Sequence, residues 1–561
     1  MRWYFEWSRA IGSIVSIVLP GDQVVQFHGI PYAAVPRRFK QSTLLENLNG
    51  THRNFKFPGF ACPHSFTMAD DHSGGLYPNE QIIEVDELAC LTVTLSIPLQ
   101  YFTAVTAPQG SARQNPGQQE GGKRMPVMAY IHGGAFHVGK ADAVHDTAPL
   151  VSQSIDDAQP VIAASLQYRI GALGFLATPD GGVNLGLCDQ RTGLEWLQRF
   201  IGGFGGDESR VTMFGESAGG FSICCHMLGR PSARPLFNRA VIMSGVLGPL
   251  MVPVSQSEAG NAFNDICEIL GIEETGRAAL EKLESVPVQR LVEAGDTWTA
   301  RGNFWRPVVD PSFFAHADVS WDAIPRLLAD CPWVGALIVG NTASEGTPYS
   351  ALAASLTPAS FRAHISAGLS EQATDRVMQT YGIEEGMDHT LFALTATRYL
   401  GDVVFDAPIH ALCSHLSSSS ALNDTKLYRY IFAVPNPFPG ASFHAVPHHW
   451  VDVYFLFRTL QFRFPNTTLK KISDEHARLW VRFAHGQAPW GECGEGGVMV
   501  ADAVQGWKEM TLEEDEQGNG RDLARLGRLW DAWAEKRGDA AWAPVRVSQI
   551  IAAQEREEEG V

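Results

Sequence analysis

The chain of 561 residues is 45% hydrophobic and 10% aromatic, so it is long and apolar enough to bury a large core. Its 61 acidic side chains exceed its 43 basic ones, and the formal net charge of −18 argues against a nucleic-acid partner held through phosphates. No stretch has the ~18 consecutive apolar residues that a membrane-spanning helix needs, so we expect no membrane span.

The N-terminal part predicts a pair of strands. The short β-branched run "SIVSIVL" ends at "PGD" and is followed by the alternating run "QVVQFHGIPYA". The alternative is the apolar core of a signal peptide, but there is a single early arginine and no small-residue cleavage site. We therefore expect an intracellular protein as the sequence is written, and a secreted one if its start is incomplete.

The rest of the chain alternates compact, β-branched runs with longer helical stretches, without internal repeats. This order predicts βαβ units around a mostly parallel central sheet flanked by helices, an α/β fold. The predicted strands are "PVMAYIH", "PVIAASLQY", "RVTMFG", "RAVIMSG", "GALIVGN" and "KLYRYIFAV", and the predicted helices include "DQRTGLEWLQRFIGG" and "SEQATDRVMQTYG".

We expect one domain over residues 11–545. The polar, glycine-rich stretch 108–124 precedes a strong strand, and we interpret it as a surface loop within that domain. Residues 546–561 end in "QEREEEGV", where like charges follow one another, and are predicted to be a solvated acidic tail.

The glycine-rich turn "HGGAF" follows the strand "PVMAYIH". Successive small residues would leave the backbone N–H groups of Gly134 and Ala135 free to face a ligand. Taken alone this is a common glycine turn. Because it lies about eighty residues before a second motif, it fits the oxyanion loop of lipases and esterases.

The second motif is "GESAG", which contains Ser217. A small residue in a tight turn is the simpler interpretation, but here a strand precedes the serine and the apolar helix "GFSICCHML" follows it, as in a nucleophile elbow. Gly215 and Gly219 would remove side chains that collide across so sharp a turn. Ala218 would contribute a further N–H donor to an oxyanion, at the positive end of the helix.

Further stretches carry a resemblance. In order along residues 11 to about 490 they are "FHGIPYA", "NLGLCDQR", "FGGDESRVTMFGESAGG", "IMSG", "WRPVVD" and "LWVRFAHGQAPW". With the two motifs, they resemble the type B carboxylesterase and cholinesterase family of α/β-hydrolases. The resemblance implies an α/β-hydrolase fold with inserted helices forming a gorge or lid, and carboxylic-ester hydrolysis by a catalytic triad with the chain order Ser, acid, His.

For the acid, the resemblance implies Glu345 in "IVGNTASEGTPY", which matches the Glu-Gly of the family. From the residues alone Glu345 could equally be an exposed loop carboxylate. Its expected role is to hold the imidazole tautomer of the base and to stabilise the imidazolium. Ser244 in "IMSG" is expected, from the resemblance alone, to be a supporting hydroxyl near the acid and the base.

For the base, "GASFHAVPHHWVDVYFLF" offers three histidines. The family pattern places the histidine three residues before an acidic position, which fits His449. His448 would need a slip of one residue, and His444 lies too far back. Trp450 stands where the family more often has glycine, so the local loop departs from the pattern.

Nine cysteines in so long a chain do not indicate a disulfide framework. The resemblance implies that Cys62 and Cys90 form the first disulfide of the family; the alternative is two buried thiols, as a reducing cytosol would impose. The other cysteines are predicted to be small core residues, and the glycosylation sequons matter only in a secreted protein. The other cysteines are Cys188, Cys224, Cys225, Cys267, Cys331, Cys413 and Cys493. The sequons begin at Asn49, Asn423 and Asn466.

These residues predict a serine esterase that needs neither a metal nor an organic cofactor and whose partner is a small-molecule ester. We expect uncharged esters to be preferred, because the segment between Cys62 and Cys90 has Phe66 and Tyr77 but no tryptophan of the kind that binds choline in cholinesterases.

Two alternatives stay open: acyl transfer, lactonisation or cyclisation in a secondary-metabolite pathway by the same triad, and a non-catalytic binding module. The first shares the acyl-enzyme and differs only in the nucleophile that resolves it. The second is opposed by the presence of all three triad residue types. The region around the histidines looks most like filamentous-fungal members of the family.

Overall fold

The structure is a computed structural model. It describes residues 23–48, 54–65, 83–100, 124–317, 319–418, 425–493, 497–539 and 541–552, together with the backbone of three short strands before residue 19. Several sequence predictions lie outside the described residues: the surface loop up to 123, the sequons at Asn49 and Asn423, the rings of Phe66 and Tyr77, and the end of the acidic tail from 553. The third sequon is described, and there Asn466 caps a helix by accepting a hydrogen bond from the Leu469 N–H.

A central 11-stranded sheet runs through the described part of the chain in the order β15-β14-β13-β12-β11-β10-β8-β9-β7-β4-β3. The strands from β14 to β9 are parallel to one another, whereas β15 at one edge and β7, β4 and β3 at the other are antiparallel. The bounds are β3 Ile17–Val18, β4 Val24–Pro31, β7 Thr92–Pro98, β8 Met125–Ile131, β9 Ile162–Leu166, β10 Gly206–Glu216, β11 Arg239–Met243, β12 Ala336–Thr342, β13 Lys426–Phe432, β14 Gly497–Asp502 and β15 Gly506–Thr511.

This arrangement confirms the predicted mostly parallel sheet, since each of the six predicted runs forms one of its strands. The predicted N-terminal pair is also present, with β3 antiparallel to β4. Two small hairpins lie outside the sheet, one of β1 Tyr4–Trp7 and β2 Gly12–Val15 and one of β5 Ala33–Ala34 and β6 Thr43–Leu44.

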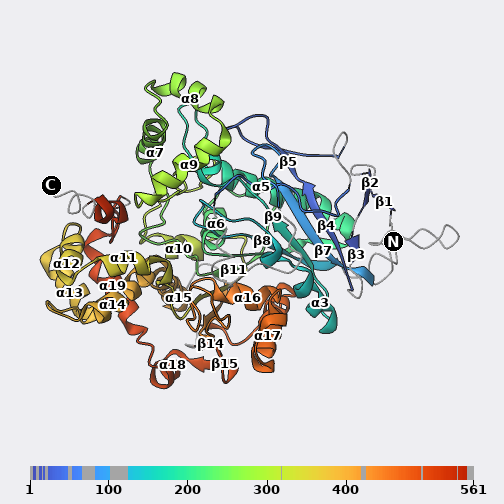
Figure 1. Cartoon of the computed structure of the whole chain (residues 1–561). Helices are drawn as coiled ribbons and strands as arrows, with labels where there is room; N and C mark the ends of the chain where they lie inside the picture. Colours follow the sequence, from blue (N-terminus) through green and yellow to red (C-terminus); the bar gives the residue numbers. More distant parts are fainter. Residues whose placement is uncertain are drawn as a thin grey trace.

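Helices lie on both faces of the sheet and in two inserted groups (Figure 1). The group α7–α9 stands at the top of the view, and α11–α14 gather with α19 at its left, which gives the inserted helices that were expected. The bounds are α3 Ala148–Asp156, α4 Gly171–Phe175, α5 Leu185–Phe200, α6 Ala218–Met227, α7 Gln256–Ile269, α8 Gly276–Ser285, α9 Val288–Ala300, α10 Ile324–Ala329, α11 Ser350–Ser355, α12 Pro358–Ser366, α13 Glu371–Tyr381, α14 His389–Gly401, α15 Ala407–Ser418, α16 Val451–Phe457, α17 Thr467–Ala484, α18 Leu512–Asn519 and α19 Ala524–Ala532.

Strand β8 illustrates why the central strands read as continuous apolar runs. Alternate residues such as Val127 and Ala129 pack into one core cluster, with side chains of α5, α6 and α15. Their neighbours Met128 and Tyr130 pack into a second cluster, with side chains of α3, α16 and α17. Since both faces of the strand are buried, both sets of side chains are apolar.

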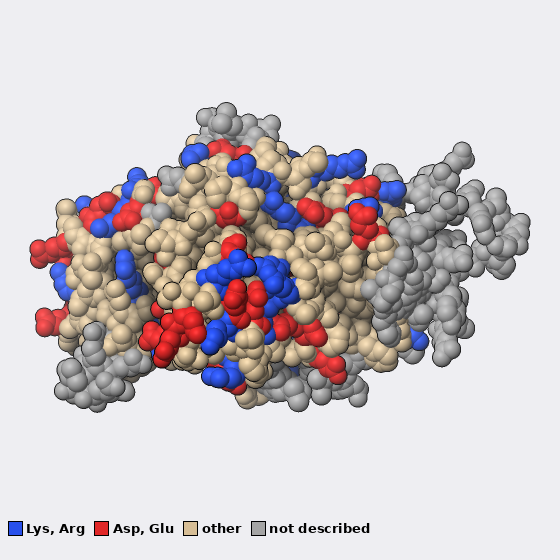
Figure 2. All heavy atoms as spheres, turned by 90° about the horizontal axis from the view of Figure 1, so that it is seen from above, with Lys and Arg blue, Asp and Glu red and all other residues tan. Residues whose placement is uncertain are grey.

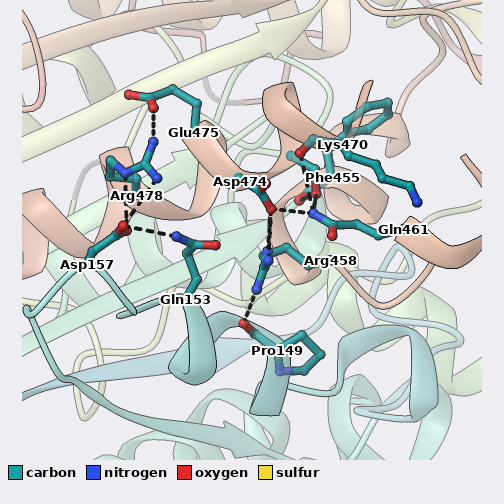
Figure 3. A network of polar contacts seen from close by, with 11 residues as sticks. Pro149, Gln153, Asp157, Phe455, Arg458, Gln461, Lys470, Asp474, Glu475 and Arg478 are labelled. Atoms are coloured by element: carbon teal, nitrogen blue, oxygen red, sulfur yellow. Dashed lines mark hydrogen bonds and ion pairs between the residues drawn. The ribbon is translucent and has the colours of Figure 1, made fainter. Parts of the chain in front are cut away.

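On the face of the sheet that α3, α16 and α17 cover, a network of polar contacts connects these helices to one another (Figure 3). Arg458, just after α16, donates to the carbonyl of Pro149 in α3 and, at 2.8 Å from Nη2, to Asp474 in α17. Arg478 of α17 reaches Asp157 at the end of α3 in the same way. Helices α3, α16 and α17 are therefore held together by charged hydrogen bonds in addition to their apolar contacts.

The acidic side chains do not form one continuous patch on the face seen in Figure 2, where acidic and basic side chains lie next to each other. On α8, for example, Arg277 pairs with Glu281 at 3.2 Å, and both side chains are largely exposed. Exposed pairs of this kind contribute little to stability.

Candidate active site

Ser217 lies between the end of β10 and the first residue of α6, at the sharp turn that the sequence predicted. Its φ of 53° and ψ of −120° are unusual for a residue with a side chain. Such a conformation costs about 1–3 kcal/mol and persists only where the surroundings enforce it. Here the Ser217 N–H donates to the Met243 carbonyl of β11 at 2.9 Å, and the Ser217 carbonyl accepts the first bond of α6. The side chain is half-buried.

The glycines of this turn are required by the end of β8 as well as by the turn itself. A Cβ atom on Gly215 would lie 2.8 Å from the backbone of Gly219, which is the predicted collision across the turn. It would also lie 2.7 Å from the Ile131 carbonyl oxygen, and a Cβ on Gly219 would lie only 2.1 Å from that oxygen. The turn can therefore pack against β8 only because both positions lack side chains.

The "HGGAF" turn lies directly against Ser217. A Cβ atom on Gly133 would be 3.3 Å from the Ser217 Cβ. Gly134 and Ala135 have φ values of 107° and 55°, so the chain reverses here through left-handed conformations. For the N–H groups of Gly134, Ala135 and Ala218 there is no hydrogen-bond acceptor among the described residues. Such donors are what an oxyanion needs.

The structure brings Glu345, His449 and Ser244 together. The Nδ1 atom of His449 makes a short hydrogen bond with Oε2 of Glu345. The other oxygen of Glu345 accepts hydrogen bonds from the Ser244 hydroxyl, at 2.6 Å, and from the Thr342 N–H. Glu345 follows β12 and is 2% exposed, so it is not the exposed loop carboxylate of the alternative interpretation.

The two other histidines of the same loop do not reach Glu345. The His448 ring is buried, with Nε2 at 3.1 Å from the side-chain amide of Asn436 and Nδ1 at the backbone carbonyl of His449. His444 is exposed. Of the three, His449 alone contacts the predicted acid.

Sequence reasoning missed Glu216, the residue directly before Ser217. Its Oε1 atom lies 3.0 Å from Nε2 of His449, so the imidazole stands between two carboxylates. A signal was available, because Glu216 is a charged residue that directly follows the buried run 211–215 at the end of β10. Such a residue needs a buried partner.

The charges around His449 shift its pKa strongly. Burial lowers the pKa of His449, but the carboxylates of Glu216 and Glu345 outweigh burial and raise it to about 9. Burial raises the pKa of Glu216 to about 8, against the attraction of His449. The two groups thus compete for protons across one contact, and a change in Glu216 must change the pKa of His449.

Ser217, His449 and the Gly133–Ala135 turn open on one cavity of about 130 Å³. Six of the other twelve lining residues carry aromatic or imidazole rings, and three carry charges. The rings are those of Phe405, Tyr349, Trp450, His64, His132 and His145, and the charged residues are Lys140, Asp142 and Glu216. The Phe405 ring stacks on His449 with centroids 4.3 Å apart. Trp450, with a φ of 78°, lies within 5.8 Å of the Tyr454 ring and 5.7 Å of the His145 ring, between centroids.

Within the described ranges, no three His, Cys, Asp or Glu side chains gather as metal ligands would. The helices described there do not combine the length and apolarity needed to cross a membrane. Cys62 and Cys90 are buried free thiols, so their disulfide stays a prediction.

Residues 9–520 match the model of the carboxylesterase family. The chain belongs to the carboxylesterase family. Lipase 3 of Yarrowia lipolytica is 27% identical over 539 residues, which cover 93% of this chain and 97% of that protein. The para-nitrobenzyl esterase of Bacillus subtilis is 28% identical over 390 residues, or 64% of this chain and 71% of that protein.

Among solved structures, a PNB esterase superimposes with a TM-score of 0.69 at 21% identity, over 92% of this chain and 98% of its own. The chain therefore has the α/β-hydrolase fold, and the family membership makes it a serine-type carboxylic-ester hydrolase. Fungal lipases among its relatives agree with the fungal resemblance. None of these comparisons favours acyl transfer or a binding module; a role in secondary metabolism stays a prediction.

Replacing Glu216 with glutamine should lower the pKa of His449 by about one unit or more, because a neutral amide no longer favours the imidazolium. A pH titration of histidine-selectively labelled enzyme, followed by NMR, measures this directly. As a control, Glu208→Gln removes a carboxylate that pairs with Arg124 near the surface and should leave the His449 titration unchanged. An unchanged or higher pKa in Glu216→Gln would contradict the expectation.

Proposed function

We propose that the enzyme hydrolyses uncharged carboxylic esters with Ser217 as nucleophile, His449 as general base and Glu345 as the orienting acid. The observation that carries the proposal is the buried Glu345–His449 hydrogen bond beside the cavity that Ser217 lines. A serine becomes nucleophilic only when a base can take its proton, and a base is held ready by a third group.

In the proposed reaction, Ser217 Oγ attacks the ester carbonyl while Nε2 of His449 takes its proton. The N–H groups of Gly134, Ala135 and Ala218 stabilise the tetrahedral oxyanion, and His449 returns the proton to the leaving alcohol. Water, activated by His449 in the same way, then hydrolyses the acyl-enzyme. Glu345 keeps the proton on Nδ1, so that Nε2 is the atom that accepts, and it stabilises the imidazolium.

Glu216 adds a step to this scheme. Without substrate, Nε2 of His449 contacts Glu216 and not the serine. We infer that the Ser217–His449 hydrogen bond forms when an ester fills the cavity, since catalytic contacts often tighten only with substrate bound. With a pKa of about 9, His449 carries a proton near neutral pH while it contacts Glu216, so Nε2 must leave Glu216 and lose that proton before it can act as the base.

The preference for uncharged esters is supported by the rings that line the cavity, which suit apolar acyl and alcohol chains. The names of two relatives point the same way. One is a secreted triacylglycerol lipase of Gibberella zeae, 32% identical over 280 residues and 46% of this chain, and the other is the para-nitrobenzyl esterase. Triacylglycerols and para-nitrobenzyl esters carry no charge.

Ser217→Ala should abolish hydrolysis of p-nitrophenyl butyrate, and a fluorophosphonate probe should label the unchanged enzyme at Ser217. His449→Ala should lower kcat by several orders of magnitude, whereas the neighbouring His448→Ala, as a matched control, should cost about tenfold or less. Circular dichroism checks that each variant is folded. Full activity in folded Ser217→Ala, or a greater loss in His448→Ala, would overturn the assignment.

The charge preference is tested by comparing butyrylcholine with 3,3-dimethylbutyl butyrate, its uncharged isostere. The kcat/KM for the neutral ester should equal or exceed that for the choline ester. Preference for the choline ester by more than about tenfold, or 1.4 kcal/mol of transition-state binding, would reveal a cation site and refute this part of the proposal while leaving the triad intact.

Trp450→Gly should raise the kcat/KM of long-chain relative to short-chain p-nitrophenyl esters by about tenfold. The substitution removes a ring from the cavity wall, and glycine adopts the φ of 78° without strain. Trp333→Gly, a half-buried tryptophan before β12 that does not line the cavity, is the matched control and should leave the ratio unchanged. An unchanged ratio in folded Trp450→Gly would show that this wall does not limit chain length.

A further inference from the structure

A second pairing of a histidine with an acidic side chain lies next to the "HGGAF" turn. His137 directly follows this turn in the chain, and its Nε2 atom is 2.8 Å from Oδ1 of Asp296 in α9. The same nitrogen is 3.3 Å from the Thr299 hydroxyl, one turn further along that helix. At the other nitrogen of the ring, the Trp305 Nε1–H donates to Nδ1 at 3.1 Å. The imidazole is therefore held at both of its nitrogens.

These partners determine the tautomer of the ring as well as its direction. An indole N–H can only donate, so Nδ1 of His137 must present a lone pair to Trp305. Nε2 then carries the proton and donates it to the Asp296 carboxylate. Burial lowers the pKa of His137, although the charge of Asp296 opposes that effect, and a neutral ring fits both contacts. His137 thus has one tautomer and one orientation.

The groups that hold this imidazole are themselves fixed in the fold. Trp305 is 1% exposed, and its ring centroid lies 4.5 Å from that of Trp298 in α9. The second carboxylate oxygen of Asp296 accepts a hydrogen bond from the Ser65 hydroxyl at 2.6 Å. The imidazole also packs on the backbone of α9, where a Cβ atom on Gly295 would lie 3.8 Å from its Cε1 atom. These contacts connect the "HGGAF" turn to the inserted group α7–α9.

The backbone connects His137 to a proposed oxyanion donor. The N–H groups of His137 and Val138 both donate to the Gly134 carbonyl at 2.9 Å. Because a trans peptide is planar, the Gly134 carbonyl and the Ala135 N–H belong to one rigid unit and point in opposite directions. Holding the carbonyl therefore also orients the Ala135 N–H, which has no acceptor among the described residues.

We propose that His137 is a positioning residue for ester hydrolysis: held by Asp296 and Trp305, it keeps the Gly134–Ala135 peptide turned so that its N–H faces the oxyanion. This role rests on the proposed esterase function and adds a residue that is not among the described residues lining the cavity. A donor oriented in advance stabilises the oxyanion more than one that must reorient during the reaction. Without its anchors the turn would relax, and transition-state stabilisation would fall.

The first experiment separates this role from a merely structural one. His137→Phe keeps an aromatic ring and removes both of its hydrogen bonds. For p-nitrophenyl butyrate, kcat should fall by about tenfold to a hundredfold and KM should change by less than about threefold. The reason is that acylation and deacylation both pass through an oxyanion, whereas the bound ester carries no such charge. A trifluoromethyl ketone, whose adduct with Ser217 carries the oxyanion, should lose affinity by the same factor as kcat/KM. An unchanged kcat in the folded variant, or an effect on KM alone, would overturn the proposal.

His137→Gln is the conservative variant. Its side-chain carbonyl can accept from Trp305 and its amide N–H can donate to Asp296, so kcat should stay within about threefold of that of the unchanged enzyme. A loss as large as that of His137→Phe would show that the two hydrogen bonds do not position the turn.

Variants on α9 test the same contact from its other side and do not depend on the folding of His137→Phe. The Asp296 side chain is 34% exposed, so Asp296→Leu should fold, and it should lower kcat without a large change in KM. Combined with His137→Phe it should cost no more than the more damaging single substitution, since both break one contact. Glu293→Leu replaces an exposed carboxylate on the same helix and is the matched control, with kcat unchanged. Additive losses in the folded double variant would contradict the coupling; circular dichroism checks each fold.

The unchanged enzyme distinguishes a failure of this inference from a failure of the proposed function. If the proposed function is wrong, the unchanged enzyme does not hydrolyse the ester and a fluorophosphonate does not label Ser217. An active, labelled enzyme whose folded His137→Phe and Asp296→Leu variants keep their kcat would refute the positioning role alone.

Discussion

The hydrogen bond between Glu345 and His449 is the contact on which the site depends. It joins the loops after two neighbouring parallel strands, β12 and β13, and neither side chain has much access to water. A buried carboxylate is tolerated only when its oxygens are satisfied, and here Ser244 and the Thr342 N–H complete that requirement. The orientation of the imidazole is thereby set by backbone positions at the edge of the sheet.

A steric constraint sets the other half of the site. The Ile131 carbonyl at the end of β8 occupies the space where side chains on Gly215 and Gly219 would lie. A Cβ atom on Gly133 would likewise lie only 2.8 Å from the Glu216 carbonyl oxygen. The turn that offers N–H donors and the turn that carries the serine therefore touch through their backbones. Their relative position does not depend on side-chain rotamers, which is how an oxyanion site can be organised before substrate binds.

The two halves are joined again behind the site. Helix α3 follows the oxyanion turn, and α16 begins directly after His449 and Trp450. Arg458 connects the end of α16 to the Pro149 carbonyl of α3 and to α17 (Figure 3). Displacing one of these helices would strain its contacts to the other two. The network therefore helps to hold the oxyanion turn before α3 and the His449 loop before α16 in place. Rigid support of this kind is what a precisely oriented base requires.

The sequence by itself determined the parts of this protein that depend on local chain geometry. The order of strand, "GESAG" and helix predicted a sharp turn with Ser217 at its corner, and the continuous β-branched runs predicted a mostly parallel sheet. The resemblance to the family then pointed to Glu345 and His449, although the residues alone left three histidines open.

Only the tertiary structure decided contacts between segments far apart in the chain. His449 meets Glu345 across 104 positions, and the same ring meets Glu216, whose importance no spacing indicates. A local pattern specifies backbone shape, but which buried polar groups share a proton depends on distances that exist only once the sheet has assembled.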